Sequence, residues 1–345
     1  MTITGWMLSK VPFAGSLLAY KDETFWLPSQ SSTIAPRIDF LFDFIMWLSI
    51  FFTVLITGLG IWFLLKYRQR DGHESPQPSP SHNVPLELLW SGIPLLIVMF
   101  IFYDGWTGYL DARTPPGDAY EIHVTGQKWS WSFLYPKNGY IDNELHVPVD
   151  TNIRLIMSSE DVLHSFFIPA FRQKMDVVPG RYNDLWFIAN EPGEYRIYCT
   201  EYCGTEHSSM LSKVIVHPTE SQLAEGGLPT YEEWLEEASN FVKNLPPIEA
   251  GQKLYETRGC TQCHSVDGSK GIGPSFKEIQ FGQSRPLQGG GTVVWDEEYI
   301  RESILNSKAK IAAGYEPVMP SYDGRFKTEE LTVLIEYMKS LNSSE

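Results

Sequence analysis

The feature that most constrains this chain is an apolar run over residues 40–65, in which Asp43 is the only charged side chain. A helix needs about 20 apolar residues to cross the hydrocarbon core of a bilayer, so this run is long enough to span it. A second apolar stretch follows at residues 88–103. The sequence therefore predicts a two-helix transmembrane hairpin over residues 40–115, preceded by an N-terminal extramembrane segment over residues 1–39.

Basic side chains predict the orientation of this hairpin. Lys66, Arg68 and Arg70 directly follow the first apolar run. Short loops rich in Lys and Arg stay on the cytoplasmic side of a membrane, which places the 66–85 loop there. Everything after residue 110 is then expected on the opposite, periplasmic or extracellular side.

The composition changes at residues 116–218, where short apolar and aromatic segments alternate with turn residues. Such a pattern over about a hundred residues is typical of an all-β Greek-key sandwich or barrel. The strands are expected at residues 121–124, 129–135, 152–157, 182–189, 194–199 and 211–216.

Soft metal ligands are concentrated near the end of this β region. Cys199, Cys203, His207 and Met210 lie within twelve residues, and His164 can supply a second imidazole. A copper ion accepts thiolate, imidazole and thioether ligands, and two thiolates can bridge a second copper ion. A disulfide between the two cysteines and a closed zinc site of two Cys and two His are the alternatives.

The segment after residue 218 is predicted to be a linker over residues 219–247, with one acidic helix at residues 231–245 before two prolines. Residues 248–345 then form a separate domain. The chain has four cysteines, and they occur as two close pairs, so no framework of structural disulfides is expected.

The last domain carries Cys260-Thr261-Gln262-Cys263-His264, the attachment signature of a c-type haem. Two thiols bind the haem covalently and the histidine provides one axial ligand. A thioredoxin-like redox pair is the alternative, but it requires a βαβ context, and this motif follows a predicted helix at residues 249–258. Met319 is chosen as the second axial ligand because it lies in a loop, whereas Met338 lies within the predicted closing helix at residues 328–341.

Two segments, Ser-Glu-Asp-Val-Leu-His-Ser at 159–165 and Cys-x-Glu-x-Cys-Gly-x-x-His-x-x-Met at 199–210, together resemble cytochrome c oxidase subunit II. The resemblance implies a cupredoxin fold for residues 116–218 and a binuclear copper centre of the CuA type. It also implies that the carbonyl of Glu201 reaches one copper ion, and that its carboxylate binds a Mg²⁺ ion shared with subunit I. The implied metal ligands are His164, Cys199, Glu201, Cys203, His207 and Met210.

The same resemblance assigns roles to other residues of the β domain. The first tryptophan of Trp129-Ser130-Trp131 matches an exposed family residue at which electrons enter, whereas Trp131 is expected to fill one face of a strand. Asp176 and Arg181 match residues that face subunit I.

Two acidic side chains lie near the ends of the second span. Glu87 by itself is a carboxylate that can reach the membrane surface, but it also matches the family's glutamate at the mouth of a proton path. Asp104, at the opposite end, is expected to be solvated.

The final domain resembles a class I cytochrome c over residues 248–345. Gly271-Ile272-Gly273-Pro274 matches the segment that packs on the haem edge, with the Pro274 carbonyl holding His264. Gly251 and Tyr255 are expected to face Tyr337 where the terminal helices cross.

The resemblance implies an electron-relay subunit in the plasma membrane of a bacterium, with its metal sites on the periplasmic side. Electrons from a donor protein would pass through the c-type haem to CuA and on to subunit I, where oxygen reduction is coupled to proton pumping. Other oxidase subunits are expected partners. A net charge of −15 argues against nucleic acid and suits a positively charged protein partner.

Three alternatives to this function remain at the level of sequence. The small subunit of a CuA-type nitric oxide reductase can carry the same modules, and Glu87 favours the oxidase. A quinol oxidase subunit II is disfavoured because such chains lack these copper ligands. A membrane-tethered copper or electron shuttle would not need two full spans or residues such as Asp176 and Arg181.

Overall fold

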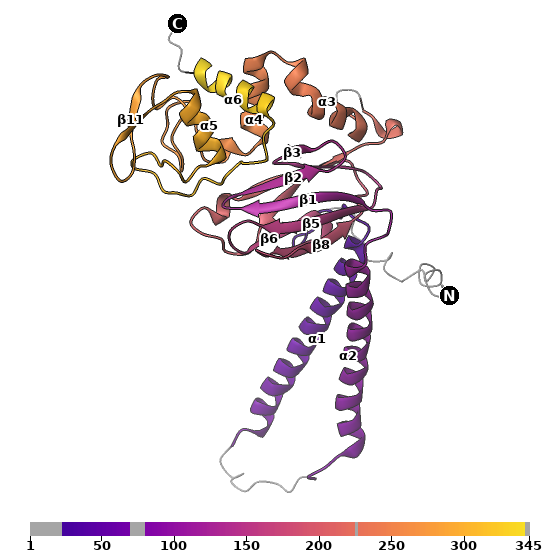
Figure 1. Ribbon diagram of the computed structural model, residues 1–345. Coiled ribbons are helices and arrows are strands. Elements are labelled where there is room, and N and C mark those ends of the chain that lie inside the picture. Colours follow the sequence, from indigo (N-terminus) through magenta and orange to yellow (C-terminus); the bar gives the residue numbers. More distant parts are fainter. Residues whose placement is uncertain (1–22, 70–79, 225–226, 342–345) are drawn as a thin grey trace. The chain divides into compact units, whose positions relative to one another are not determined.

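The computed structural model describes residues 23–69, 80–224 and 227–341 (Figure 1). The chain divides into two compact units, one holding the N-terminal helices up to Thr114 and the other holding Ser31–Thr33 and everything from Pro115 onward. Most of the predicted N-terminal segment, together with Arg70 and the centre of the predicted cytoplasmic loop, lies outside the described residues.

The first unit contains two long apolar helices, α1 (Ala35–Tyr67) and α2 (Val84–Arg113). Both are long and apolar enough to cross a membrane. Each has a proline in its first turn, where the missing N–H costs no hydrogen bond, and Asn83 caps α2 by accepting from the backbone N–H of Leu86 at 3.3 Å. The predicted hairpin is confirmed, although α1 begins at Ala35 rather than at residue 40 because Pro36 suits a first helical turn.

Arg37 joins the two helices at the end away from the loop. Its guanidinium bonds to Asp104 at 3.2 Å and to Asp111 at 2.9 Å. The Asp104 side chain is buried by this pairing, so the expectation that it is solvated was wrong. Local sequence patterns do not reveal this pair, because Arg37 and Asp104 lie 67 residues apart.

The second unit begins with two five-stranded sheets (Figure 1). The first sheet has the order β3 (Tyr140–Asp142), β2 (Ser130–Tyr135), β1 (Tyr120–Gln127), β5 (Ile153–Ser159) and β8 (Asn183–Phe187). The second has the order β4 (Leu145–Pro148), β10 (Leu211–His217), β9 (Gly193–Cys199), β6 (His164–Ile168) and β7 (Gln173–Val177). Two neighbouring pairs, β1 with β5 and β4 with β10, are parallel, and the other pairs are antiparallel.

The apolar core of this β domain follows the two-residue period of its strands. In β5, Ile153, Leu155 and Met157 are fully buried while the residues between them are partly exposed. The predicted cupredoxin-like sandwich is confirmed, and each of the six predicted strands is present. Strands β3, β4, β6 and β7 were missed because they are only three to five residues long, too short to show a clear alternation.

Helix α3 (Tyr231–Asn244) follows the β domain and starts at a capping box formed by Thr230 and Glu233. The predicted acidic helix is therefore present, but it is more than a linker. The ring of Trp234 stacks on His146 with 3.8 Å between centroids and meets Tyr135 edge-on at 5.2 Å. The helix thus covers one part of the β domain.

The C-terminal domain contains α4 (Pro247–Thr257), α5 (Glu297–Leu305) and α6 (Thr328–Ser340), with a small hairpin of β11 (Ser284–Pro286) and β12 (Thr292–Val294). Helices α4 and α6 cross at Gly251, where an added Cβ would lie 2.2 Å from the carbonyl oxygen of Val333. The rings of Tyr255 and Tyr337 meet beside this crossing at 5.9 Å, as the sequence predicted. This arrangement confirms the predicted helical cytochrome c fold, although the β11–β12 hairpin shows that the domain is not entirely α-helical.

Candidate metal centre and cofactor cavity

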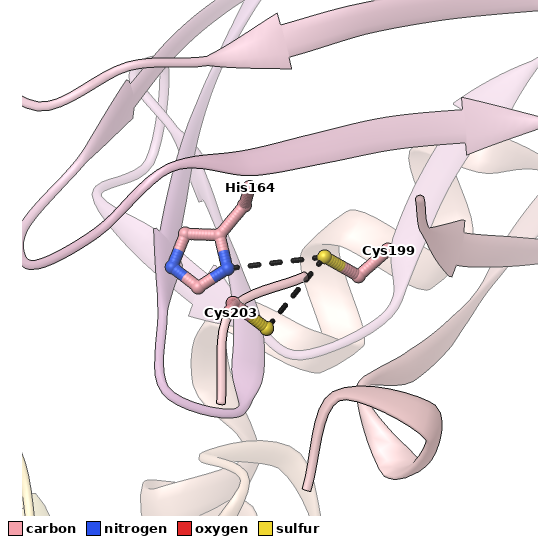
Figure 2. A group of neighbouring side chains, drawn as sticks. All are labelled: His164, Cys199 and Cys203. Carbon is pink, nitrogen blue, oxygen red and sulfur yellow. Dashed lines mark hydrogen bonds between the residues drawn. The ribbon is translucent and has the colours of Figure 1, made fainter. Parts of the chain in front are cut away.

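The predicted metal ligands come from two places in the second sheet. His164 begins β6, Cys199 ends β9, and Cys203 lies in the loop between β9 and β10. Figure 2 shows the imidazole of His164 and the two thiols pointing toward one another. The Cys199 sulfur lies 3.9 Å from His164 Nδ1 and 3.9 Å from the Cys203 sulfur. All three side chains are buried, and their ligand atoms lie within 4.8 Å of one another, close enough to bind one metal ion together.

The other predicted ligands complete the same site. His207 Nδ1 lies 3.4 Å from the Cys203 sulfur, and the Met210 sulfur lies 3.9 Å from it. On the other side, the Cys199 thiol donates to the carbonyl oxygen of Glu201 at 3.3 Å. The site therefore offers two thiols, two imidazoles, one thioether and one carbonyl, a set dominated by the ligands that copper prefers.

The disulfide alternative does not agree with this geometry. A disulfide bond is about 2.05 Å long, whereas the Cys199 and Cys203 sulfurs are 3.9 Å apart and both thiols are free. A closed zinc site would use the two cysteines and two histidines, but it would leave the buried thioether of Met210 without a role.

The two thiols differ in their tendency to ionise. Burial raises the pKa of the Cys199 thiol, but hydrogen bonding with His164 and with the backbone at Ser165 and Glu201 outweighs this effect and brings the pKa to about 6. Burial, followed by the neighbouring charge of Cys199, raises the pKa of the Cys203 thiol to about 12. One negative charge is therefore favoured and a second is opposed, unless a cation lies between the sulfurs.

Asp161 fixes the orientation of His164 and was not predicted. Its Oδ1 accepts a hydrogen bond from His164 Nε2 at 2.8 Å, which turns the Nδ1 lone pair toward Cys199. Partial burial raises the pKa of Asp161, but its bonds to His164 and to the backbone N–H groups of Val162 and Lys128 outweigh burial and hold the pKa below its usual value. The sequence did contain one indication of this role, because Asp161 lies three residues before the predicted ligand His164.

A large cavity in the C-terminal domain is lined by all four predicted haem ligands, Cys260, Cys263, His264 and Met319. The cavity opens to solvent, and its space together with that at its mouth amounts to about 1240 Å³. Its lining also includes apolar and aromatic side chains such as Ile272, Phe276 and Tyr322, and such a lining suits the flat apolar body of a haem. Met338 also lines the cavity, so a position in the cavity wall does not by itself show which of the two methionines is the axial ligand.

The position of His264 suits an axial ligand. Its Nδ1 donates to the carbonyl oxygen of Pro274 at 2.7 Å, which leaves the Nε2 lone pair for a metal. A Cβ at Gly273 would lie 2.5 Å from the imidazole ring, so only glycine allows this close approach. The predicted contact of the 271–274 segment with His264 is confirmed.

Trp129 lies between the two sites. It lines the haem cavity, and a Cβ added to Gly204, the residue after Cys203, would be 3.2 Å from its ring. Its side chain is half-buried, whereas the sequence led us to expect an exposed ring. The difference arises because the C-terminal domain covers this face. Trp131 is buried in the core as predicted.

Glu87, Asp176 and Arg181 are not among the groups gathered at either site. The Glu87 carboxylate accepts from the backbone N–H of Asn83 at 2.9 Å, so it caps the start of α2. Asp176 and Arg181 are exposed, and Asp176 accepts from the Ser165 hydroxyl at 2.7 Å. The Glu201 side chain is exposed, and its role in holding a Mg²⁺ ion shared with subunit I stays a prediction.

Two histidines that looked scattered in the sequence form a buried pair. His146 Nδ1 lies 2.9 Å from His217 Nε2, and His217 Nδ1 donates to the carbonyl oxygen of Pro229 at 2.9 Å. Burial, together with the neighbouring His217, lowers the pKa of His146 to about 2. The pair lies beneath Trp234 and is separate from the metal ligands.

Comparisons with known proteins agree with this architecture. The family descriptions that match are the transmembrane domain of cytochrome c oxidase subunit II at residues 21–103, its periplasmic domain at residues 137–217, and cytochrome c at residues 248–342.

Several curated proteins named cytochrome c oxidase subunit 2 are similar over much of their length. The protein from Alkalihalophilus pseudofirmus is 29% identical over 90% of this chain and 90% of its own. The protein from Thermostichus vulcanus is 31% identical over 56% of this chain and 75% of its own. A crystal structure of the periplasmic domain of subunit II of cytochrome oxidase from Bradyrhizobium japonicum is 31% identical, with a TM-score of 0.33, over 37% of this chain and 99% of its own.

These matches cover the helical hairpin, the β domain and the C-terminal domain in the order in which the chain presents them. The cytochrome c domain implies a haem, and the subunit II domain implies copper, in agreement with the ligands found in each. The chain thus belongs to the cytochrome c oxidase subunit II family, carries an additional C-terminal cytochrome c domain, and is a membrane-bound subunit of an oxidoreductase.

Proposed function

We propose that this chain relays electrons from a donor protein through a covalent c-type haem and a two-copper CuA centre to oxidase subunit I. When bound, the haem and the copper ions supply reversible one-electron chemistry at the two ends of the relay. Cys260 and Cys263 would hold the haem covalently, with His264 and Met319 as its axial ligands. The role of the protein is to fix both sites at a constant separation.

The observation that carries the two-copper proposal is the division of the metal site into two similar halves. The Cys199 sulfur has His164 and the Glu201 carbonyl beside it. The Cys203 sulfur has His207 and Met210 beside it. Each half therefore pairs one thiol and one imidazole with one weak ligand. Two copper ions held between these halves would use every one of these groups, whereas a single ion would not.

Trp129 supports a direct route between the two sites. Its ring lines the haem cavity and also lies against Gly204, beside the Cys203 half of the metal site. An aromatic ring in contact with both sites shortens the distance that an electron must tunnel. Electrons from the attached haem would therefore reach copper through Trp129 without a separate diffusing carrier.

Exposed residues of the β domain are proposed to face subunit I. Asp176 and Arg181 would contact that subunit, and the Glu201 carboxylate would share a Mg²⁺ ion with it. The β domain and the cytochrome domain would lie on the periplasmic side of a bacterial plasma membrane, with Glu87 at the opposite side as the mouth of a proton path. Because Glu87 also caps α2, a proton role requires that this hydrogen bond be exchanged.

Purification of the tagged chain in mild detergent tests this function. We expect a polytopic subunit bearing haem and copper to co-purify, and the c-type haem of the reduced complex to be reoxidised rapidly on mixing with oxygen. A chain that purifies alone would support the shuttle. Reoxidation by nitric oxide but not by oxygen would support the reductase.

A pair of variants links reoxidation to the copper ligands. Cys203→Ser should stop oxygen-driven reoxidation of the haem and leave its absorption spectrum intact. Ser208→Ala, in the same loop but with an exposed side chain, should behave like the unsubstituted chain. Unimpaired reoxidation in the Cys203→Ser complex would overturn the proposed relay.

A further inference from the structure

Arg325 lies in the turn before α6 and bonds to two segments of the β domain. We propose that Arg325 is a positioning residue for the internal electron transfer: it holds the wall of the haem cavity against the turn that carries Trp129. This inference rests on the proposed relay and adds to it a residue that binds neither cofactor.

On the haem side, the backbone fixes Arg325 closely. Its N–H donates to the carbonyl oxygen of Tyr322 at 3.0 Å, in a turn where Gly324 adopts a positive φ of 73°. The guanidinium carbon lies 6.0 Å from the centre of the Tyr322 ring. Tyr322 and Phe326 both line the haem cavity and form part of its wall. A movement of Arg325 would therefore move this part of the cavity wall.

On the copper side, the first partner of Arg325 is Gln127. Arg325 Nη1 donates to Gln127 Oε1 at 3.0 Å, and Gln127 Nε2 donates to the Ser130 hydroxyl at 3.2 Å. Gln127 ends β1 and Ser130 begins β2, so the amide spans the two-residue turn that contains Trp129. Gln127 is 3% exposed, so this bond is shielded from water.

The second partner is Glu160, whose carboxylate pairs with Arg325 Nη2. The Glu160 backbone N–H donates to the carbonyl oxygen of Gly126 at 3.1 Å. The next residue, Asp161, accepts from the backbone N–H of Lys128 at 2.8 Å and from the predicted copper ligand His164 at 2.8 Å. The Trp129 turn and the His164 loop are thus one hydrogen-bonded network, and Arg325 attaches the haem domain to it.

The chemistry of arginine suits this position better than that of lysine. An exposed ion pair stabilises little, but the Arg325 side chain is only 16% exposed and also bonds to a buried amide. The planar guanidinium directs separate N–H groups to Gln127 and to Glu160 at the same time, whereas an ammonium group on a flexible stem does not fix two partners in a plane. We therefore expect Arg325→Lys to retain only part of the effect.

The test is the rate of internal electron transfer in the complete purified complex after rapid photoreduction of the haem. In Arg325→Gln this rate should fall roughly five- to tenfold, the factor expected for a docking equilibrium that loses a shielded, charge-assisted pair. Both optical spectra and both midpoint potentials should stay as they are in the unsubstituted complex. Arg301→Gln, the same change on α5 of the same domain, is the matched control and should leave the rate unchanged.

A double-variant comparison tests the pairing itself. Glu160→Gln should slow transfer in the unsubstituted background but have little further effect in an Arg325→Gln background, because the partner has already been removed. Amide hydrogen exchange of a peptide covering residues 126–132 should become faster in Arg325→Gln, a change that does not depend on either cofactor reacting.

Two results would overturn the proposal. An unchanged rate in Arg325→Gln at both low and high ionic strength would show that the contact does not set the geometry. A slower rate accompanied by a changed haem or copper spectrum would show that Arg325 supports a cofactor site rather than the docking. Failure of the proposed relay is a different result, since internal transfer would then be missing from the unsubstituted complex as well.

Discussion

The crossing of α4 and α6 at Gly251 decides whether Gly251→Ala raises or lowers the stability of the cytochrome domain. In an isolated helix, replacing a glycine by alanine stabilises the helix by about 1 kcal/mol. Here the alanine Cβ would lie 2.2 Å from the Val333 carbonyl oxygen and 2.5 Å from Tyr337 Cβ. Ordinary contact begins at 3.4 Å, so the two helices would have to separate by more than 1 Å.

The expected cost follows from this displacement. Forcing extra atoms into a packed interface costs typically 1–3 kcal/mol, and we expect the upper part of this range, about 2–3 kcal/mol, because the shortest contact here is with backbone, which cannot rotate away. After subtraction of the helix-propensity gain, we expect Gly251→Ala to destabilise the cytochrome domain by about 1–2 kcal/mol. For a domain of this size each kcal/mol corresponds to a change in Tm of about 4–8 °C, so the Tm should fall by roughly 4–16 °C.

Thermal unfolding followed by haem absorbance in the purified complex measures this change, because that signal reports the cytochrome domain. Gln252→Ala, at an exposed position on the same helix, is the control and should stay within about 0.5 kcal/mol of the unsubstituted chain. A rise in Tm for Gly251→Ala would mean that the propensity gain prevails, and the close crossing would be refuted.

Three further predictions concern the ligands and the buried histidines. Met319→Ala should convert the haem toward the high-spin form in optical and EPR spectra, and if Met338→Ala does so instead, the axial assignment is wrong. Glu87→Gln keeps an oxygen that can cap α2, so it should slow turnover without altering either metal spectrum; full activity would leave Glu87 with the capping role alone. The pKa of His146 is lowered to about 2 in the folded chain, so the unfolded chain gains a proton first as the pH falls below about 6.5, and folding weakens. As the pH falls from 6.5 to 4.5, this histidine should reduce the free energy of unfolding by about 2–3 kcal/mol. In denaturant titrations of the complex, the free energy of unfolding should therefore depend less on pH in His146→Phe than in the unsubstituted chain. An equal pH dependence in the two would contradict the buried neutral pair.

The sequence predicted best those features that are coded locally. Cys199, Cys203, His207 and Met210 lie within twelve residues, and the haem motif occupies five consecutive residues. The chemistry of both motifs could therefore be inferred before any fold was known. His164 needed the resemblance, because it comes from a strand 35 residues earlier that was not predicted.

Features that depend on tertiary contacts were missed. The His146 and His217 pair requires the parallel pairing of β4 with β10, and the sequence offers no sign of which short strands pair in parallel. The burial of Trp129 depends on a second domain covering it, and the burial of Asp104 depends on Arg37 from the other helix. In each case the environment of a side chain is set by a distant segment, which local patterns do not report.

The copper content of the chain tests the central proposal most directly. Copper and c-type haem can be quantified in the purified complex with the unsubstituted chain and with the double variant Cys199→Ser/Cys203→Ser, which keeps neither thiol, so that copper in partner subunits cancels in the difference. The proposed centre predicts that two copper ions per c-type haem are lost in the variant. A loss of one ion would contradict the binuclear centre, and no loss would contradict copper binding at this site altogether.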